Sequence, residues 1–110
     1  AFRLARPGDW WFHAKDLPGA HVLFRREDGV EAPPEERWIR EIAALAAWYS
    51  RGRGSGRVWV DYTQRKHVRS LPEKGIAGVR YSSFKSVLAE PKPWDGVLRG
   101  LREDPEEGEI

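Results

Sequence analysis

The chain of 110 residues contains no cysteine and no methionine. Without cysteine, a disulfide framework and a zinc site built on thiolates are both excluded. Cysteine-free composition also fits a reducing compartment, so we expect a cytoplasmic protein. No apolar run approaches the roughly 20 residues that cross a bilayer, and the first residues lack the apolar core of a signal peptide. We therefore expect no membrane partner.

Asparagine is absent as well, and Gln64 is the only side-chain amide. Arginine supplies 14 of the 19 basic residues. Few thermolabile amides, together with an excess of arginine, favour a heat-adapted source, a thermophile. Because no methionine stands at position 1, we expect a fragment of a longer chain or a processed start.

Acidic and basic residues are unevenly distributed along the chain, although the formal net charge is only +2. Residues 103–110 hold five carboxylates and no basic side chain, whereas the segment from Arg51 to Lys92 holds ten basic and three acidic residues. Such an imbalance predicts a positive surface, whose commonest partner is nucleic acid. We expect these cations to gather on one side of the folded molecule.

Apolar and polar residues alternate as in strands over Trp10–Phe12, His21–Arg25 and Arg57–Tyr62. In the third of these strands, Trp59 and Asp61 point to the face opposite Val58 and Val60. Two later segments, Gly78–Ser82 and Phe84–Glu90, predict a hairpin that turns at Ser82-Ser83.

Between the second and third strands, apolar residues recur at helical spacing from Trp38 to Tyr49. Pro34 suits the first helical position, and the alanines of this segment would let a helix lie close to a sheet. We predict one helix over Pro34–Ser50, ended by Gly52 in the left-handed conformation. The fold class is therefore α+β, a mainly antiparallel sheet packed against one long helix.

Two histidines, two aspartates and three aromatics fall within the segment from Asp9 to Val22. His13 and His21, with Asp9 and Asp16 nearby, could form a metal site, but the dense spacing of a zinc or iron site is missing. The imidazoles could instead tie the turn together through hydrogen bonds, or face a ligand. No nucleophile motif is present, so we predict no catalytic residue, no metal and no cofactor.

Basic side chains cluster in two further segments. The run from Arg51 to Arg57 follows a helix and so cannot act as a P-loop, which precedes one. It is either a loop that touches phosphates or a solvated turn whose arginines complement the helix end. The segment from Asp61 to Arg69 follows a strand, and its cations suit RNA phosphates or protect a sheet edge. The predicted RNA-binding residues are Arg53, Arg57, Arg65, Lys66, His67 and Arg69.

Four blocks of sequence, in order, resemble the NFACT-R domain. They are D-W-W-F-H-A-K-D with P-G-A-H-V (residues 9–16 and 18–22), the helical block over Ala43–Ser50, V-W-V-D-Y-T (residues 58–63) with Lys66 and Val68, and G-V-R-Y (residues 78–81). Roughly residues 4–92 are covered. Ala20 replaces the family's serine, and the family's upstream glycine-rich block is absent, so the chain is either a trimmed domain or a small variant.

This resemblance implies the C-terminal RNA-binding domain of NFACT proteins, which include bacterial RqcH and fibronectin-binding protein A-like proteins. They act in ribosome-associated quality control, binding the large (50S) subunit with a stalled peptidyl-tRNA and recruiting tRNA for alanine tailing. We therefore expect a noncatalytic RNA-binding domain over residues 1–92 and a linker with an acidic tail over 93–110. Its partners would be tRNA, the 50S subunit or other NFACT segments.

The motif residues are expected to build a pocket or turn, and they are Asp9, Trp11, His13, Gly19, His21, Asp61, Tyr62 and Thr63. Three alternatives stay open. One is a stand-alone RNA-binding module linked to RNA modification. Another is a metal-dependent enzyme that uses His13 and His21. The last is a module that docks on a ribosomal protein.

Overall fold

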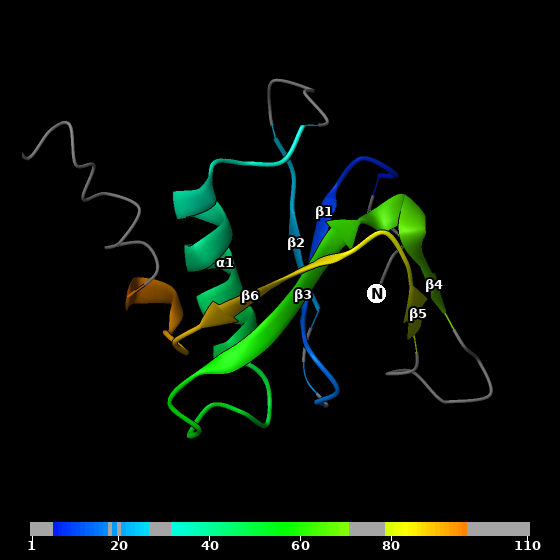
Figure 1. Ribbon diagram of the computed structural model, residues 1–110. Helices are drawn as coiled ribbons and strands as arrows, with labels where there is room; N and C mark the ends of the chain where they lie inside the picture. The colour runs from blue at the N-terminus through cyan, green and yellow to red at the C-terminus, as the bar shows by residue number, and fades with distance from the viewer. Residues whose placement is uncertain (1–5, 18, 20, 27–31, 71–78, 97–110) are drawn as a thin grey trace, which may run out of the picture.

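A four-stranded antiparallel sheet forms the centre of the computed structural model, which describes residues 6–17, 19, 21–26, 32–70 and 79–96. The strands lie in the order β2-β1-β3-β6 (Figure 1). Their bounds are Trp10–Ala14 for β1, Val22–Phe24 for β2, Val58–Gln64 for β3 and Lys85–Ala89 for β6. The first three predicted strands are confirmed, with ends that differ by one or two residues.

One helix, α1 (Glu36–Trp48), covers one face of this sheet (Figure 1). It has 13 residues, so the predicted span Pro34–Ser50 is too long at both ends. Glu35 precedes the helix with an extended ψ of 150°, which keeps Pro34 outside it. At the other end, Ser50 forms an isolated antiparallel bridge with Gly19. The α+β class is confirmed, with a shorter helix than predicted.

Gly52 does not end α1 in the left-handed conformation, so that prediction is wrong. Among the described glycines only Gly56 has a positive φ, of 80°, and the helix ends at Tyr49 with a φ of −90°. Gly52 is instead buried, and a Cβ there would lie 2.7 Å from Val58 Cγ2 and 2.9 Å from Leu17 Cδ1. The position needs glycine because two side chains occupy the space of a Cβ.

The hydrophobic core lies between α1 and the sheet. Small alanine side chains on the inner face of α1 let the helix approach the strands closely, as predicted. Alternate residues of each strand point toward them. The buried members are Trp10, Phe12, Ala14, Ile39, Ile42, Ala43, Ala46, Ala47, Val58, Val60 and Ala89.

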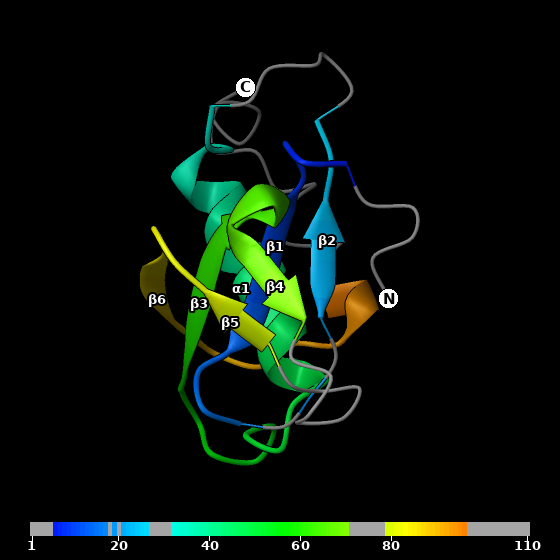
Figure 2. The same ribbon diagram turned by 90° about the vertical axis from the view of Figure 1, so that its right-hand side faces the viewer.

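A separate two-stranded ribbon lies on the side of the sheet away from α1 (Figure 2). The 3₁₀ turn η1 (Arg65–His67) leads from β3 into β4 (Val68–Ser70), which pairs antiparallel with β5 (Val79–Tyr81). One sheet face is thus covered by the helix and part of the other by this ribbon.

The predicted hairpin around Ser82-Ser83 is wrong, because β5 pairs with β4 and β6 pairs with β3. The chain passes from the ribbon to the main sheet at Ser83, whose φ is 52°. Thr63 Oγ1 lies 3.1 Å from the carbonyl oxygens of both Ser82 and Ser83 and donates to them. This buried hydroxyl fixes the point where the chain changes sheets.

The chain remains in contact with α1 beyond β6. The backbone N–H of Lys92 donates to the carbonyl oxygen of Ala44 at 3.1 Å, and residues 94–96 form a helical turn. The division into a domain over 1–92 and a tail over 93–110 stays a prediction, because residues 97–110 lie outside the described ranges. Within those ranges, no helix is long and apolar enough to cross a membrane.

Candidate functional site

Trp11 and two histidines form an aromatic cluster on the sheet face opposite α1. Trp11 is fully buried, and its ring stacks on that of His13, with centroids 5.5 Å apart and planes 6° apart. His21 meets both rings edge-on, at 5.4 Å from Trp11 and 4.9 Å from His13. Tyr81 of β5 closes the cluster 4.7 Å from Trp11. The structure therefore brings three of the predicted residues together, and it adds a tyrosine from the ribbon.

Burial in this cluster lowers the pKa of both histidines. For His21, desolvation and the nearby His13 lower the pKa from 6.5 to about 4. For His13, desolvation lowers the pKa, and this outweighs the opposing effects of the Ala14 and Gly19 backbone and the Asp61 charge. Both imidazoles are therefore neutral at pH 7, which suits ring stacking better than phosphate binding.

The free energy of unfolding should consequently fall as the pH drops below 6.5. Between that value and the folded-state pKa of about 4, the unfolded chain binds more protons than the folded one at His21, so stability is lost on acidification. A pKa shift of one unit corresponds to about 1.4 kcal/mol. Between pH 6.5 and roughly pH 5 we expect a loss of about 2 kcal/mol, measured by urea unfolding.

His21→Phe provides the control for this pH dependence, since it keeps a ring but removes the titrating group. The dependence should become flatter in this variant, and the part that remains comes from His13, whose pKa is also lowered by burial. Asp9, whose pKa is lowered, changes the free energy of unfolding only at still lower pH, so it does not contribute to the change between pH 6.5 and 5. Equal pH dependence in the two proteins would contradict the assignment.

Asp9 and its partners lie at the start of β1. Its carboxylate accepts a bidentate pair from Arg25, with Nε–Oδ1 and Nη2–Oδ2 distances of 2.8 Å, and the Arg6 amide donates to Oδ2 at 2.8 Å. The hydrogen bond from Arg25 holds the pKa of Asp9 below its usual value. Within the described ranges, no three His, Cys, Asp or Glu side chains converge as metal ligands. The metal interpretation of His13 and His21 therefore finds no ligand set there.

Asp61 of β3 is the second centre of this face and has no solvent exposure. Tyr81 Oη donates to Oδ2 and Ser86 Oγ to Oδ1, each at 2.5 Å. Lys15 Nζ lies 3.2 Å from Oδ2 and completes the set with an opposite charge. Burial and the bond to Asp61 raise the pKa of the Tyr81 hydroxyl. One carboxylate thus joins the β1 end, β5 and β6 to the central strand.

The remaining motif residues pack against neighbouring elements. Tyr62 points to the α1 side, where its ring stacks 5.3 Å from Phe12. Thr63 is buried at the crossing described above. Gly19 lies against Ser50, and a Cβ there would be only 2.8 Å from the Ser50 Cα. The motifs therefore build a packed cluster and its supports.

The six predicted RNA-binding residues fall into two groups at opposite ends of β3. Arg53 and Arg57 precede the strand, whereas Arg65, Lys66, His67 and Arg69 follow it. Seven strand residues separate the groups by roughly 20 Å. The expectation that the second-half cations gather into one patch is therefore not met by these six residues.

Arg53 is engaged at the end of α1. Its Nε donates to the Trp48 carbonyl oxygen at 2.7 Å, and its guanidinium lies 4.6 Å from the Trp48 ring centroid. This supports the alternative in which a loop arginine complements the helix end. In the second group, Arg65 Nη1 donates to the Val68 carbonyl oxygen at 2.8 Å, while Lys66 and Arg69 are exposed.

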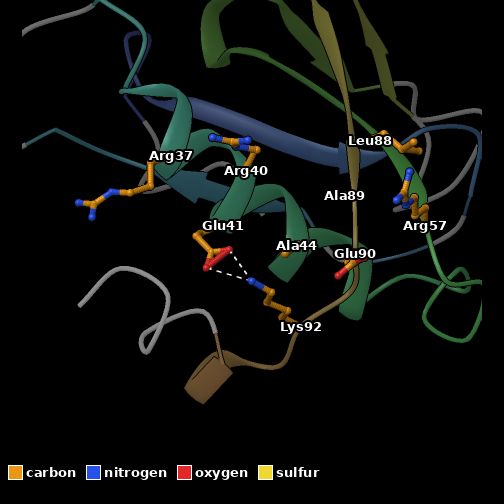
Figure 3. A pocket seen from close by; sticks show the side chains of 9 residues that line it. All are labelled: Arg37, Arg40, Glu41, Ala44, Arg57, Leu88, Ala89, Glu90 and Lys92. Carbon is orange, nitrogen blue, oxygen red and sulfur yellow. Dashed lines mark hydrogen bonds and ion pairs between the residues drawn. The ribbon is translucent and has the colours of Figure 1, made fainter. Parts of the chain in front are cut away.

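Sequence reasoning missed a groove of about 470 Å³ between α1 and β6 (Figure 3). Four basic and two acidic side chains line it, together with smaller apolar residues. The lining residues are Arg37, Arg40, Glu41, Ala44, Arg57, Leu88, Ala89, Glu90 and Lys92. Lys92 Nζ pairs with Glu41 at 3.0 Å. The spacing of Arg37 and Arg40 on one helix face was a signal for this groove.

Known proteins resemble this chain in both sequence and structure. It is 37% identical over 89 residues to the "Rqc2 homolog RqcH" of Bacillus subtilis and 36% identical over 91 residues to that of Streptococcus suis. These matches cover 81% and 82% of the chain. The chain is a homologue of one region of the RqcH proteins. It spans only 15% and 16% of the length of these curated relatives.

A solved structure places this region at the C-terminal end of a related protein. The C-terminal part of the fibronectin/fibrinogen-binding protein from Streptococcus suis matches with a TM-score of 0.73 and 32% identity, over 89% of this chain and 37% of that one. No protein-family model matches the chain. The resemblance predicted from the motifs is nevertheless confirmed by the RqcH homologues.

The motif blocks that resemble the NFACT-R domain converge on the buried cluster. The first block supplies Trp11, His13 and His21, the strand block supplies Asp61, and the last block supplies Tyr81. The position of the family's serine, Ala20, lies outside the described residues. In this RqcH homologue, the motifs therefore join β1, β3 and the ribbon into one unit.

Proposed function

We propose that this chain is a noncatalytic, cytoplasmic RNA-binding module that contacts tRNA or large-subunit ribosomal RNA in ribosome-associated quality control. Its relation to RqcH proteins supports the context. The buried motif cluster supports a structural rather than a catalytic use of His13 and His21, because their rings pack on Trp11.

The distribution of charge is the observation that carries this proposal. Fifteen basic and eight acidic side chains lie in the described ranges. Asp9, Glu41 and Asp61 are buried, whereas the side chains of their cationic partners Arg25, Lys92 and Lys15 are 39–42% exposed. Three of the eight carboxylates are thus buried while their cationic partners stay at the surface, and the excess of exposed cations favours a polyanionic partner.

Charge reversal in η1 and β4 tests the proposal. The double variant Lys66→Glu, Arg69→Glu should weaken binding to tRNA or to purified large subunits by at least tenfold. Since each lost phosphate contact removes about one unit from the slope of log affinity against log salt, the slope should fall by about two. Filter binding at several salt concentrations measures both quantities.

The exchange variant Lys66→Arg, Arg69→Lys is the matched control, because it keeps both charges at the same positions. It should bind with an affinity close to that of the original chain. An unchanged affinity and an unchanged salt slope in the charge-reversed protein would contradict a role for this surface.

A further inference from the structure

Three of the large apolar side chains exposed on the sheet face opposite α1 lie in β3, in β6 and just before β6. Trp59 of β3 is 52% exposed, and its cross-strand partner Leu88 of β6 is 39% exposed. Phe84, just before β6, is 42% exposed. We name Trp59, Phe84 and Leu88 the β6 strip. Strand alternation places Trp59 away from the core, so its indole does not serve the packing against α1.

The β4–β5 ribbon covers the neighbouring part of this face but leaves the β6 strip open. Tyr81 of the ribbon packs on Trp11 and on the edge of Phe84, with ring centroids 4.7 Å and 5.1 Å apart. Lys15 Nζ lies 4.8 Å from the Phe84 ring centroid while it pairs with Asp61. The strip therefore carries a fixed cation at its Phe84 end.

The basic groove adjoins the other end of the strip. Leu88 belongs to both surfaces, and Arg57, which precedes β3, lines the groove beside it (Figure 3). Arg40 faces the same groove from α1. Within the described residues, Arg40 and Arg57 form no ion pair with a carboxylate, whereas Lys92 is neutralised by Glu41. Arg57 thus stands two residues before the exposed indole, on the same face of the chain by strand alternation, and Arg40 offers a second guanidinium across the groove from Leu88.

An indole ring beside guanidinium groups matches the chemistry of an unpaired nucleotide. Bases without a pairing partner stack on aromatic rings, and their phosphates bind arginine. A duplex hides its base faces and could use only the cations. We propose that the β6 strip and the groove together bind an unpaired RNA strand, with a base on Trp59 and the adjoining phosphates at Arg57 and Arg40. This inference rests on the proposed function, that the chain binds RNA.

Two RNA probes and three variants of the whole chain test this proposal. The probes are an unpaired oligoribonucleotide of about 12 nucleotides and a blunt duplex of the same sequence. Trp59→Ala should weaken binding of the unpaired probe about tenfold, since one stacked base contributes an effect of this size. Trp59→Phe keeps a ring and should restore most of the affinity. Tyr49→Ala removes an equally exposed aromatic elsewhere and should change nothing.

Tryptophan fluorescence supplies a second readout, because a base stacked on an indole quenches its emission. Quenching by the unpaired probe should be smaller in Trp59→Phe than in the original chain at equal saturation. The duplex should bind the original chain and Trp59→Ala with the same affinity.

The outcomes separate this inference from the proposed function. Salt-dependent RNA binding with equal affinities of the original chain and Trp59→Ala would overturn the inference and leave the proposed function standing. Failure of the original chain to bind any RNA or the large subunit would overturn both. Loss of nuclease-resistant subunit binding in Trp59→Ala, without loss of oligonucleotide affinity, would identify a protein-docking surface and overturn the inference.

Discussion

Replacement of Asp61 by alanine is expected to lower the free energy of unfolding by about 3 kcal/mol. The carboxylate has no solvent exposure and accepts hydrogen bonds from Tyr81, Ser86 and Lys15. Its removal leaves the tyrosine hydroxyl without its acceptor in a partly buried site. Lys15 would turn to water, since its side chain is already 39% exposed. Equilibrium urea unfolding gives the difference.

The loss should be specific to the buried network. Glu90→Ala removes an exposed carboxylate at the end of β6 and should change the free energy of unfolding by less than about 0.5 kcal/mol. Tyr81→Phe combined with Asp61→Ala should cost less than the sum of the two single changes, because the residues share one hydrogen bond. Strict additivity, or equal losses in Asp61→Ala and Glu90→Ala, would contradict the network.

The elements predicted correctly from the sequence are those whose signal is local. Apolar residues at helical spacing define α1, and alternation defines β1 and β3, since each pattern is written within a few consecutive residues. The helix ends were misplaced because they depend on distant contacts: Ser50 bridges to Gly19. Gly52 was predicted to end the helix, whereas the structure shows that the side chain of Val58 occupies the space that a Cβ would need there.

The pairing of β5 and β6 could not be predicted, because the correct arrangement rests on long-range contacts. A short polar connection between two strands favours a hairpin. Here the buried Thr63, about 20 positions away, donates to both carbonyl oxygens at Ser82 and Ser83. The two strands consequently enter different sheets. No local pattern in Val79–Tyr81 distinguishes these two pairings.

The candidate site was predicted as a set of motifs but not as a structure. His13 and His21 were correctly grouped with Trp11, yet their partner Tyr81 comes from β5, far along the chain. The prediction that the cations form one patch was not met by the six named residues, because a count of charges along the sequence does not say where the side chains lie in the fold. The alternation of β3 indicated that the indole of Trp59 points away from the core. Together with the nearby Arg57, this exposed ring favours a ligand that binds both a ring and a cation.

Trp11→Ala is expected to lower the free energy of unfolding by about 4 kcal/mol, within the range for large buried aromatics. Its ring contacts His13, His21 and Tyr81 and fills the space between the sheet and the ribbon. Alanine would leave a cavity between the sheet and the ribbon, and a cavity adds to the loss of buried apolar area. Thermal and urea unfolding measure the loss.

Trp59→Ala is the matched control within the same chain, because Trp59 lies on the same face of the neighbouring strand and is half exposed. It should cost less than about 1 kcal/mol while it weakens binding of unpaired RNA. Trp11→Ala should show the converse, a large loss of stability with little change in RNA affinity. The affinity is measured at a temperature where this variant is still folded, so that its exposed cations and the β6 strip are intact. If Trp59→Ala destabilised the chain as much as Trp11→Ala, the division of this face into a structural cluster and a binding surface would be wrong.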